Sequence, residues 1–174
     1  MIISVEDAKK YITTTESDEG IEARLQAIEV LIRKYTNNNF QQRNIRSKSS
    51  VMSQKLFAPD HLFKVGDTVE ISQSLFNDGL YVIQDIEDSL ITLNKNLMDE
   101  SDVLVTKVEY PVDVVMGVVN MLQWDLSNRK KVGIQSETIS RHSVTYFNMD
   151  GDNSIMGYQK SILGFLKPYM KARF

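Results

Sequence analysis

Cysteine is absent from the 174-residue sequence, and several other signatures are missing with it. Without cysteine the chain has no disulfide, no thiolate zinc site and no cysteine nucleophile, so packing alone must hold its fold. Its eight glycines are scattered singly and match neither G-x-x-x-x-G-K-[ST] nor G-x-G-x-x-G. The common phosphate-binding loops are therefore excluded, and no fixed period recurs that would indicate a repeat architecture.

Long apolar runs and a strong positive charge are also lacking. The longest apolar stretch, residues 112 to 126, is interrupted by polar residues and is shorter than the ~20 residues of a spanning helix. The first ten residues, MIISVEDAKK, carry acids where an export signal would be basic, so we expect a cytoplasmic product with no membrane role. The net charge of −3 and the pI of about 5.4 argue against a protein whose main task is gripping nucleic acid.

The segment VGIQSETISRHSVTYF, residues 132–147, contains Ser136, Ser140 and His142, which are the residue types of a serine hydrolase. A serine nucleophile needs a histidine base, an orienting acid and oxyanion-hole donors. No G-x-S-x-G elbow is present to expose such a serine. We therefore expect no catalytic residues: His142 is interpreted as an exposed or interface histidine, and His61 as a loop or turn residue.

Metal and cofactor sites are not expected either. The segment DGDNS, residues 150–154, is similar to the start of a calcium loop, but Ile155 replaces the sharp-turn glycine and Ser161 replaces the bidentate glutamate. We interpret the segment as a solvated turn. Two isolated histidines without cysteine leave no transition-metal cluster.

Two helices are expected in the first 40 residues. Ser4 can accept from first-turn amides and Asp7 can act as the capping-box acid of a short helix. Ser17 or Asp18 offers a second N-cap. Beyond it, apolar residues at three- and four-residue steps predict an amphipathic helix that ends at a run of three asparagines. Its apolar stripe consists of Ile21, Leu25, Ile28, Leu31 or Ile32, and Tyr35.

The character of the sequence changes after this helix. Residues 41–53, QQRNIRSKSSVMS, are polar and serine-rich, and we interpret them as a flexible connector carrying Arg43, Arg46 and Lys48. From Gln54 onward, apolar and polar residues alternate and glycine-containing turns recur, which predicts β-strands. We expect an antiparallel barrel or sandwich of about five strands that forms a separate module.

Helical patterns return at Pro111, which suits the first turn of a helix. The following segment is apolar nearly all the way round and needs cover on more than one face, which a neighbouring subunit would supply. The last stretch, YQKSILGFLKPYMKARF, is interpreted as a short helix stopped by Pro168 and a basic, aromatic tail. The expected fold class is α+β: a small α-helical bundle with an inserted β module. Its domains are residues 1–50, 51–110 and 111–174, the first and last forming the helical domain.

Three parts of the chain carry a resemblance to a known family. They are DEGIEARLQAIEVLIRKYTNNNF, PVDVVMGVVNMLQWDL, and VGIQSETISRHSVTYF together with GYQKSILGFLKPYMKARF. They resemble head-tail connector (adaptor) proteins of long-tailed bacteriophages, of the type found in phages of staphylococci and other Gram-positive hosts. The resemblance covers residues 1–45 and 111–174. Residues 54–110 are an insertion, in which SLFNDGLYVI is similar to small β modules of other phage structural proteins.

The resemblance implies a non-enzymatic virion protein at the junction of capsid and tail, assembled in the host cytoplasm. Such a protein forms an oligomeric ring, a dodecamer, beneath the portal protein, and it serves head completion by extending the DNA channel. Its partners would be the portal and the stopper or tail completion protein, while DNA would pass through the lumen without specific binding. Ring subunits meet through heterologous contacts, one face of a copy against a different face of the next.

Carried over to this sequence, the resemblance assigns two groups of residues. The loop and strand that would meet a neighbouring subunit or the stopper contain Ser136, Glu137, Ser143, Val144, Thr145 and Tyr146. The tail that would dock on the portal contains Lys167, Tyr169, Lys171, Arg173 and Phe174.

Two alternatives remain open. Basic and aromatic residues can bind single strands by charge and stacking, so the chain could be a small non-enzymatic adaptor that binds nucleic acid or a tail component through the β module. Retention on DNA that weakens with salt would favour this alternative. A serine hydrolase using His142 is the other, and replacing His142 by alanine should abolish its turnover.

Overall fold

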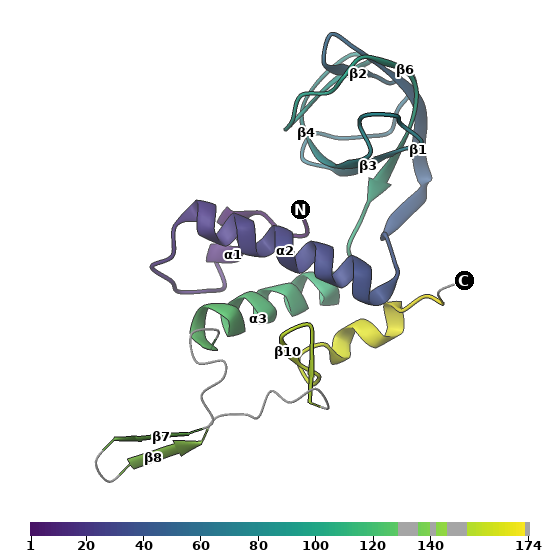
Figure 1. The fold of residues 1–174 in the computed structure, drawn as a ribbon. Coiled ribbons are helices and arrows are strands. Elements are labelled where there is room, and N and C mark those ends of the chain that lie inside the picture. Colours follow the sequence, from purple (N-terminus) through teal and green to yellow (C-terminus); the bar gives the residue numbers. More distant parts are fainter. Residues whose placement is uncertain (129–135, 140–141, 146–152, 173–174) are drawn as a thin grey trace. The chain divides into compact units, whose positions relative to one another are not determined.

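A computed structural model describes residues 1–128, 136–139, 142–145 and 153–172. The protein is mixed α+β, and the chain divides into two compact units (Figure 1). Met1 and residues 39–110 form one unit, which is a closed, antiparallel β-barrel. Residues 2–38 and 111–174 form the other, which contains the helices. The barrel strands are β1 (Gln41–Met52), β2 (Lys55–Phe57), β3 (Thr68–Ser72), β4 (Gly79–Glu87), β5 (Leu90–Leu93) and β6 (Glu100–Val108).

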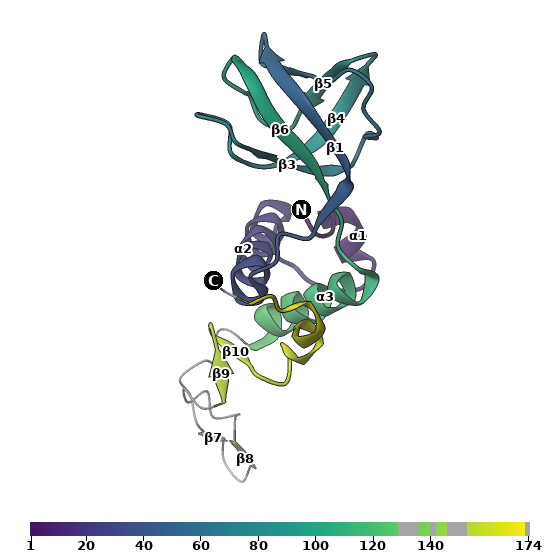
Figure 2. The same ribbon diagram turned by 90° about the vertical axis from the view of Figure 1, so that its right-hand side faces the viewer.

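The barrel closes in the strand order β1-β2-β5-β4-β3-β6. Figure 1 looks along the barrel and Figure 2 shows the strands from the side. β1 pairs with β6 from Gln41 opposite Val108 to Val51 opposite Glu100, and β6 continues the sheet to β3. The interior is filled by apolar side chains from all six strands. They include Val51, Leu56, Val69, Ile71, Ile83, Ile91, Leu93, Val103 and Val105.

The interpretation of residues 41–53 as a flexible connector is wrong, because residues 41–52 form the long strand β1. Arg43, Arg46 and Lys48 are exposed on this strand. Only Ile45 and Val51 give it apolar side chains that pack into the barrel core, and Ser49 is the other buried position. A strand with one solvated face and so few apolar residues on the other lacks the usual alternation. The barrel consequently has six strands where about five were expected.

The first two helices follow the sequence predictions closely. α1 (Val5–Lys9) is capped by Ser4, whose side chain accepts from the Asp7 amide. α2 (Asp18–Thr36) has Ser17 as its N-cap, and Asn37 ends it in the left-handed conformation with φ 49°. The stripe residues Ile21, Leu25, Ile28 and Ile32 are buried. These helix ends were predictable because capping depends on a few neighbouring residues.

The third helix, α3 (Val112–Asn128), packs against both α2 and the 3₁₀ helix η2 (Gly164–Tyr169). These contacts bury Val114, Gly117, Val118, Val119, Met121, Leu122 and Asp125. Much of the cover that was expected from a neighbouring subunit is therefore supplied by the chain itself. Val112, which is 78% exposed, and Met116 remain accessible. Arg129, Lys130 and Lys131, expected to finish this helix, lie outside the described residues.

The C-terminal segment differs from its prediction. Two short strands, β9 (Ser154–Ile155) and β10 (Tyr158–Gln159), pair before η2 begins. Pro168 lies inside η2 and does not stop it. The fixed φ of proline is compatible with a short 3₁₀ helix, so the residue is tolerated there. Within the described part of the chain, no helix combines the length and apolar character needed to cross a membrane.

Candidate interaction surfaces

The tail that was expected to dock on a portal is fixed to the helical unit as far as Ala172. Asn38 Nδ2 donates to the Tyr169 carbonyl at 3.1 Å, and Asn37 Nδ2 donates to the Ala172 carbonyl at 2.8 Å. The Lys171 amide donates to the Thr36 carbonyl at 2.8 Å. The asparagine run therefore ends α2 and also holds the last described residues. Arg173 and Phe174 lie outside the described part of the chain.

The side chain of Tyr169 is hydrogen-bonded to α3. Its hydroxyl lies 2.7 and 2.8 Å from the two carboxylate oxygens of Asp113, in the first turn of α3. The hydrogen bond to Asp113, together with partial burial, raises the pKa of Tyr169. Lys167, Met170 and Lys171 are exposed. Two of the predicted docking residues, Lys167 and Lys171, are thus displayed on an anchored backbone and Tyr169 contributes to the anchor.

The other predicted interface group is brought together in a β-hairpin. β7 (Ser136–Ile139) pairs antiparallel with β8 (His142–Thr145) as a two-stranded sheet. Ser136 lies opposite Thr145, Glu137 opposite Val144 and Thr138 opposite Ser143. Five of the six predicted interface residues are therefore on one small sheet. Tyr146 and the candidate nucleophile Ser140 lie outside the described residues.

Of the two histidines, His61 is the one whose side chain the structure describes. His61 lies in a loop, as expected, where its Nε2 is 3.2 Å from the Asp88 carbonyl and its Nδ1 accepts from the Phe63 amide. This ring therefore holds a turn. Of the calcium-like segment, Asp150, Gly151 and Asp152 fall outside the described residues. Elsewhere in the described chain, no cluster of three or more histidines and carboxylates could hold a metal ion.

A fourth feature was missed by the sequence analysis. The barrel end opposite the one where the chain enters and leaves carries four exposed apolar side chains, which we call the apolar tip. Its members are Met52, Leu75, Phe76 and Met98. They come from the last residue of β1, the β3–β4 loop and the β5–β6 loop. Turn residues were expected at Asn77, Asp78 and Gly79, but the preceding Leu75–Phe76 pair has no periodicity that would indicate an exposed position.

Scans against protein-family models and a search of curated proteins found no match for this chain.

Proposed function

We propose that this chain is a non-enzymatic structural protein of a bacteriophage virion, a head-tail connector that forms a ring beneath the portal. The proposal starts from the resemblance of residues 1–45 and 111–174 to that family. In the proposal, α1, α2, α3 and η2 form the connector-type helical bundle and the barrel is an insertion between α2 and α3. The ring, a dodecamer, would join capsid to tail at head completion and leave a lumen through which DNA passes.

The observation that carries this proposal is the two-stranded hairpin β7–β8. Its residues 136–139 and 142–145 pair with each other, and among the described residues they form no sheet with a third strand. A two-stranded hairpin is marginal in water by itself, and its outer edges present backbone donors and acceptors to any added strand. A strand added by a neighbouring copy or by the stopper would stabilise the hairpin and would pair with the backbone groups of its edge.

The proposed partners are neighbouring copies of the chain, the portal protein and the DNA that passes through the lumen. Head-to-tail contacts between copies close a ring when the rotation between neighbours is right. The anchored tail, with Lys167 and Lys171 exposed, is the surface proposed for the portal. An acidic chain with a net charge of −3 suits a channel through which DNA must slide without being held.

A proline in the hairpin tests the assembly role. Val144→Pro removes a backbone donor and distorts β8, and we expect it to abolish ring formation with the portal protein encoded in the same genome. Val144→Thr keeps the β-branched shape and should assemble like the wild type. Mass photometry and electron microscopy of the mixtures measure the outcome. Normal rings from Val144→Pro would contradict the role given to the hairpin.

A second function has one observation in its favour. Arg43, Arg46 and Lys48 are all exposed on β1, so the barrel presents a row of cations. Such a row could bind nucleic acid, which would make the chain a DNA- or tail-component-binding adaptor that acts through its β module. Affinity for DNA that falls steeply between 50 and 200 mM salt, at about one power of salt per phosphate contact, would favour this function. A triple substitution to glutamine should then remove the affinity.

A further inference from the structure

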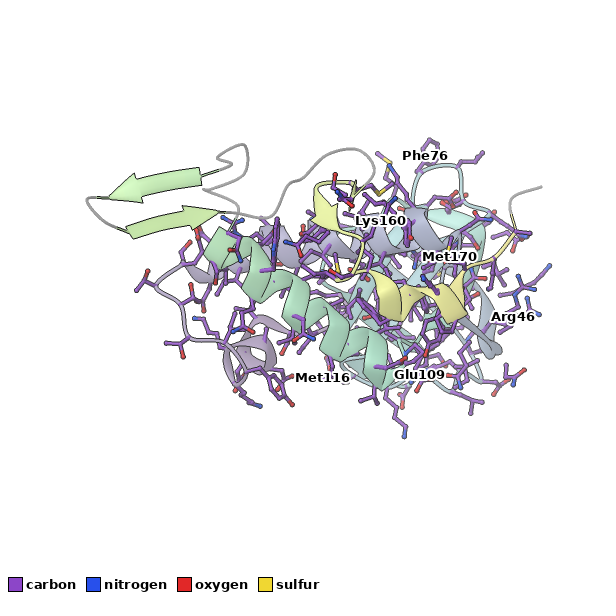
Figure 3. The ribbon with its side chains drawn as sticks, turned by 90° about the horizontal axis from the view of Figure 1, so that it is seen from below. Arg46, Phe76, Glu109, Met116, Lys160 and Met170 are labelled. Atoms are coloured by element: carbon purple, nitrogen blue, oxygen red, sulfur yellow. The ribbon has the colours of Figure 1, made fainter. Side chains whose placement is uncertain are left out.

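The apolar tip lies at one end of the barrel. Gln41 pairs with Val108 where the chain enters and leaves the barrel, and Val51 pairs with Glu100 at the opposite end. The β1–β2, β3–β4 and β5–β6 connections all lie at that opposite end. Leu75 is 84% exposed and Phe76 65% exposed, and Figure 3 shows Phe76 on its loop. Single exposed apolar residues are ordinary, but several gathered at one end indicate a binding surface.

Two of the loops that carry the tip are tied together by one buried amide. The Asn77 side chain donates to the Met98 carbonyl and accepts from the Met98 amide, both at 2.8 Å. Asn77 is only 3% exposed. Its carbonyl also accepts from the Tyr81 hydroxyl at 2.9 Å. The β3–β4 and β5–β6 loops are therefore fixed relative to each other with Leu75, Phe76 and Met98 outward.

A carboxylate fixes the same loops from the other side. Glu100 accepts from the Leu75 amide at 2.7 Å, from Asn77 Nδ2 at 3.1 Å and from the Ser74 hydroxyl. Ser74 Oγ in turn accepts from the Phe76 and Asn77 amides. A surface that is ordered before binding loses little entropy when it binds, so these exposed apolar side chains are prepared for a partner.

The charged residues around the apolar tip indicate what kind of partner it binds. Asp78 and Asp99, both exposed, flank the tip in the same two loops, where they outnumber the single exposed cation, Lys95. Carboxylates beside the apolar side chains disfavour anionic lipid and nucleic acid, which attract basic residues. They favour an apolar groove on a protein with cations at its edge.

The helical unit of this protein has a groove of about 580 Å³ along α3, lined by apolar and uncharged polar side chains. We call it the Trp124 groove. Its apolar and aromatic lining comes from Trp124 of α3 with Ile162 and Phe165 beside η2, and its remaining lining is uncharged. Lys160, labelled in Figure 3, precedes the lining residue Ser161 and is exposed, as is Lys167 in η2. Trp124, Ile162 and Phe165 match the apolar side chains of the tip, and the uncharged polar side chains of the lining can donate to its acids.

We propose that the apolar tip of one copy inserts into the Trp124 groove of a second copy. The contact joins two different surfaces of the same chain, so it is heterologous and can propagate from copy to copy until a ring closes. This contact does not depend on the portal, because it requires only that copies of the chain associate. It also gives the inserted barrel a role in assembly, separate from that of the hairpin.

Trp124 is the only tryptophan and reports directly on the groove. When the concentration of the wild-type protein is raised, the fluorescence emission of Trp124 should shift to shorter wavelength, because the tip of another copy covers the indole. Phe76→Ser should abolish that shift. Leu62→Ser is the matched control, because Leu62 is 70% exposed but lies in the β2–β3 loop at the other end of the barrel. Equal shifts in the two variants would overturn the proposal.

Crosslinking tests whether the apolar tip contacts the Trp124 groove. Because the sequence has no cysteine, only the introduced cysteines can react. Leu75→Cys and Ser161→Cys are made in separate chains of different length, mixed, and treated with a short bifunctional maleimide. We expect a mixed dimer at least ten times more abundant than from Leu62→Cys with Ser161→Cys. A dominant Leu75→Cys homodimer, or equal yields with the control, would overturn the contact.

The two proposals fail separately in these experiments. Rings on the portal that form equally well with Phe76→Ser, and that give no mixed crosslink, would overturn the tip-to-groove contact and leave the connector function standing. A strong mixed crosslink from a protein that never joins a portal would support the contact and contradict the connector function.

Discussion

The ring of Phe165 lies directly over the backbone of Gly117, so that a Cβ built on Gly117 would be 2.3 Å from Phe165 Cζ. Gly117 is buried in α3, and Phe165 belongs to η2. No real Cβ sits that close to a ring, so the glycine is what permits η2 to approach α3. This close approach also shapes the Trp124 groove, which Phe165 helps to line.

Gly117→Ala should therefore destabilise the helical unit, although alanine favours helix by about 1 kcal/mol over glycine. We expect a net loss of about 1–3 kcal/mol, the cost of overpacking a tight contact. Urea unfolding followed by Trp124 fluorescence measures it within the correct unit. Gly20→Ala in α2 is the control, because its added Cβ meets only the movable end of the Glu16 side chain. That variant should be as stable as the wild type or more so.

Removing the Asn77 amide should loosen the apolar tip. Asn77→Ala leaves the Met98 amide and carbonyl without these partners, and we expect the barrel to lose about 1–3 kcal/mol of stability. Hydrogen exchange should accelerate first in residues 74–78 and 97–100. Asn96→Ala, at an exposed position of the same β5–β6 loop, should change stability by less than about 0.5 kcal/mol. Equal effects of the two variants would contradict the role of Asn77.

The Glu100 carboxylate should make these loops sensitive to acid. Hydrogen bonds from Ser74 and from the Leu75 amide hold the pKa of Glu100 below its ordinary value, which is about 4.3 in an unfolded chain. The stabilisation is therefore present above that pH and is lost as pH falls through the lower folded pKa. Exchange protection of residues 74–78 should fall in that acidic range, and Glu100→Gln should lack this part of the pH dependence. A Glu100 carboxyl pKa at or above the ordinary value of glutamate, measured by NMR, would contradict the assignment.

Ser49 offers a stabilising substitution. It is 7% exposed in β1, and among the described residues its hydroxyl oxygen has no hydrogen-bond partner. Burying an unsatisfied hydroxyl costs free energy, so Ser49→Ala should leave stability unchanged or raise it by up to about 1 kcal/mol. Denaturant unfolding of the barrel measures the change. A loss of more than about 1 kcal/mol would show that the hydroxyl has a partner.

Local features were predictable from sequence, and tertiary ones were not. The helix ends at Ser4, at Ser17 or Asp18, and at the run of three asparagines were predictable because capping depends on residues within one turn. The structure selects Ser17 and Asn37. β1 was missed because Ile45, Ser49 and Val51 give its inward face too little apolar character to alternate visibly. The anchoring of the segment that ends η2 depends on Thr36, Asn37 and Asn38, which are distant in sequence.

For the candidate surfaces too, the sequence indicated segments but not their tertiary contacts. The antiparallel segments around Glu137 and Val144 were selected through a resemblance, and the structure adds their pairing. The apolar tip gave no sequence signal, because Leu75 and Phe76 occupy a loop, and the bonds that hold them outward come from Asn77 and Glu100.

The connector function is tested most directly by cryo-electron microscopy of the protein mixed with the portal protein encoded in the same genome. The account predicts a closed ring of copies on one end of the portal, twelve if the ring is a dodecamer, with β7–β8 at the boundaries between subunits. Single copies that remain unattached to the portal, at protein concentrations where the portal itself is intact, would contradict it.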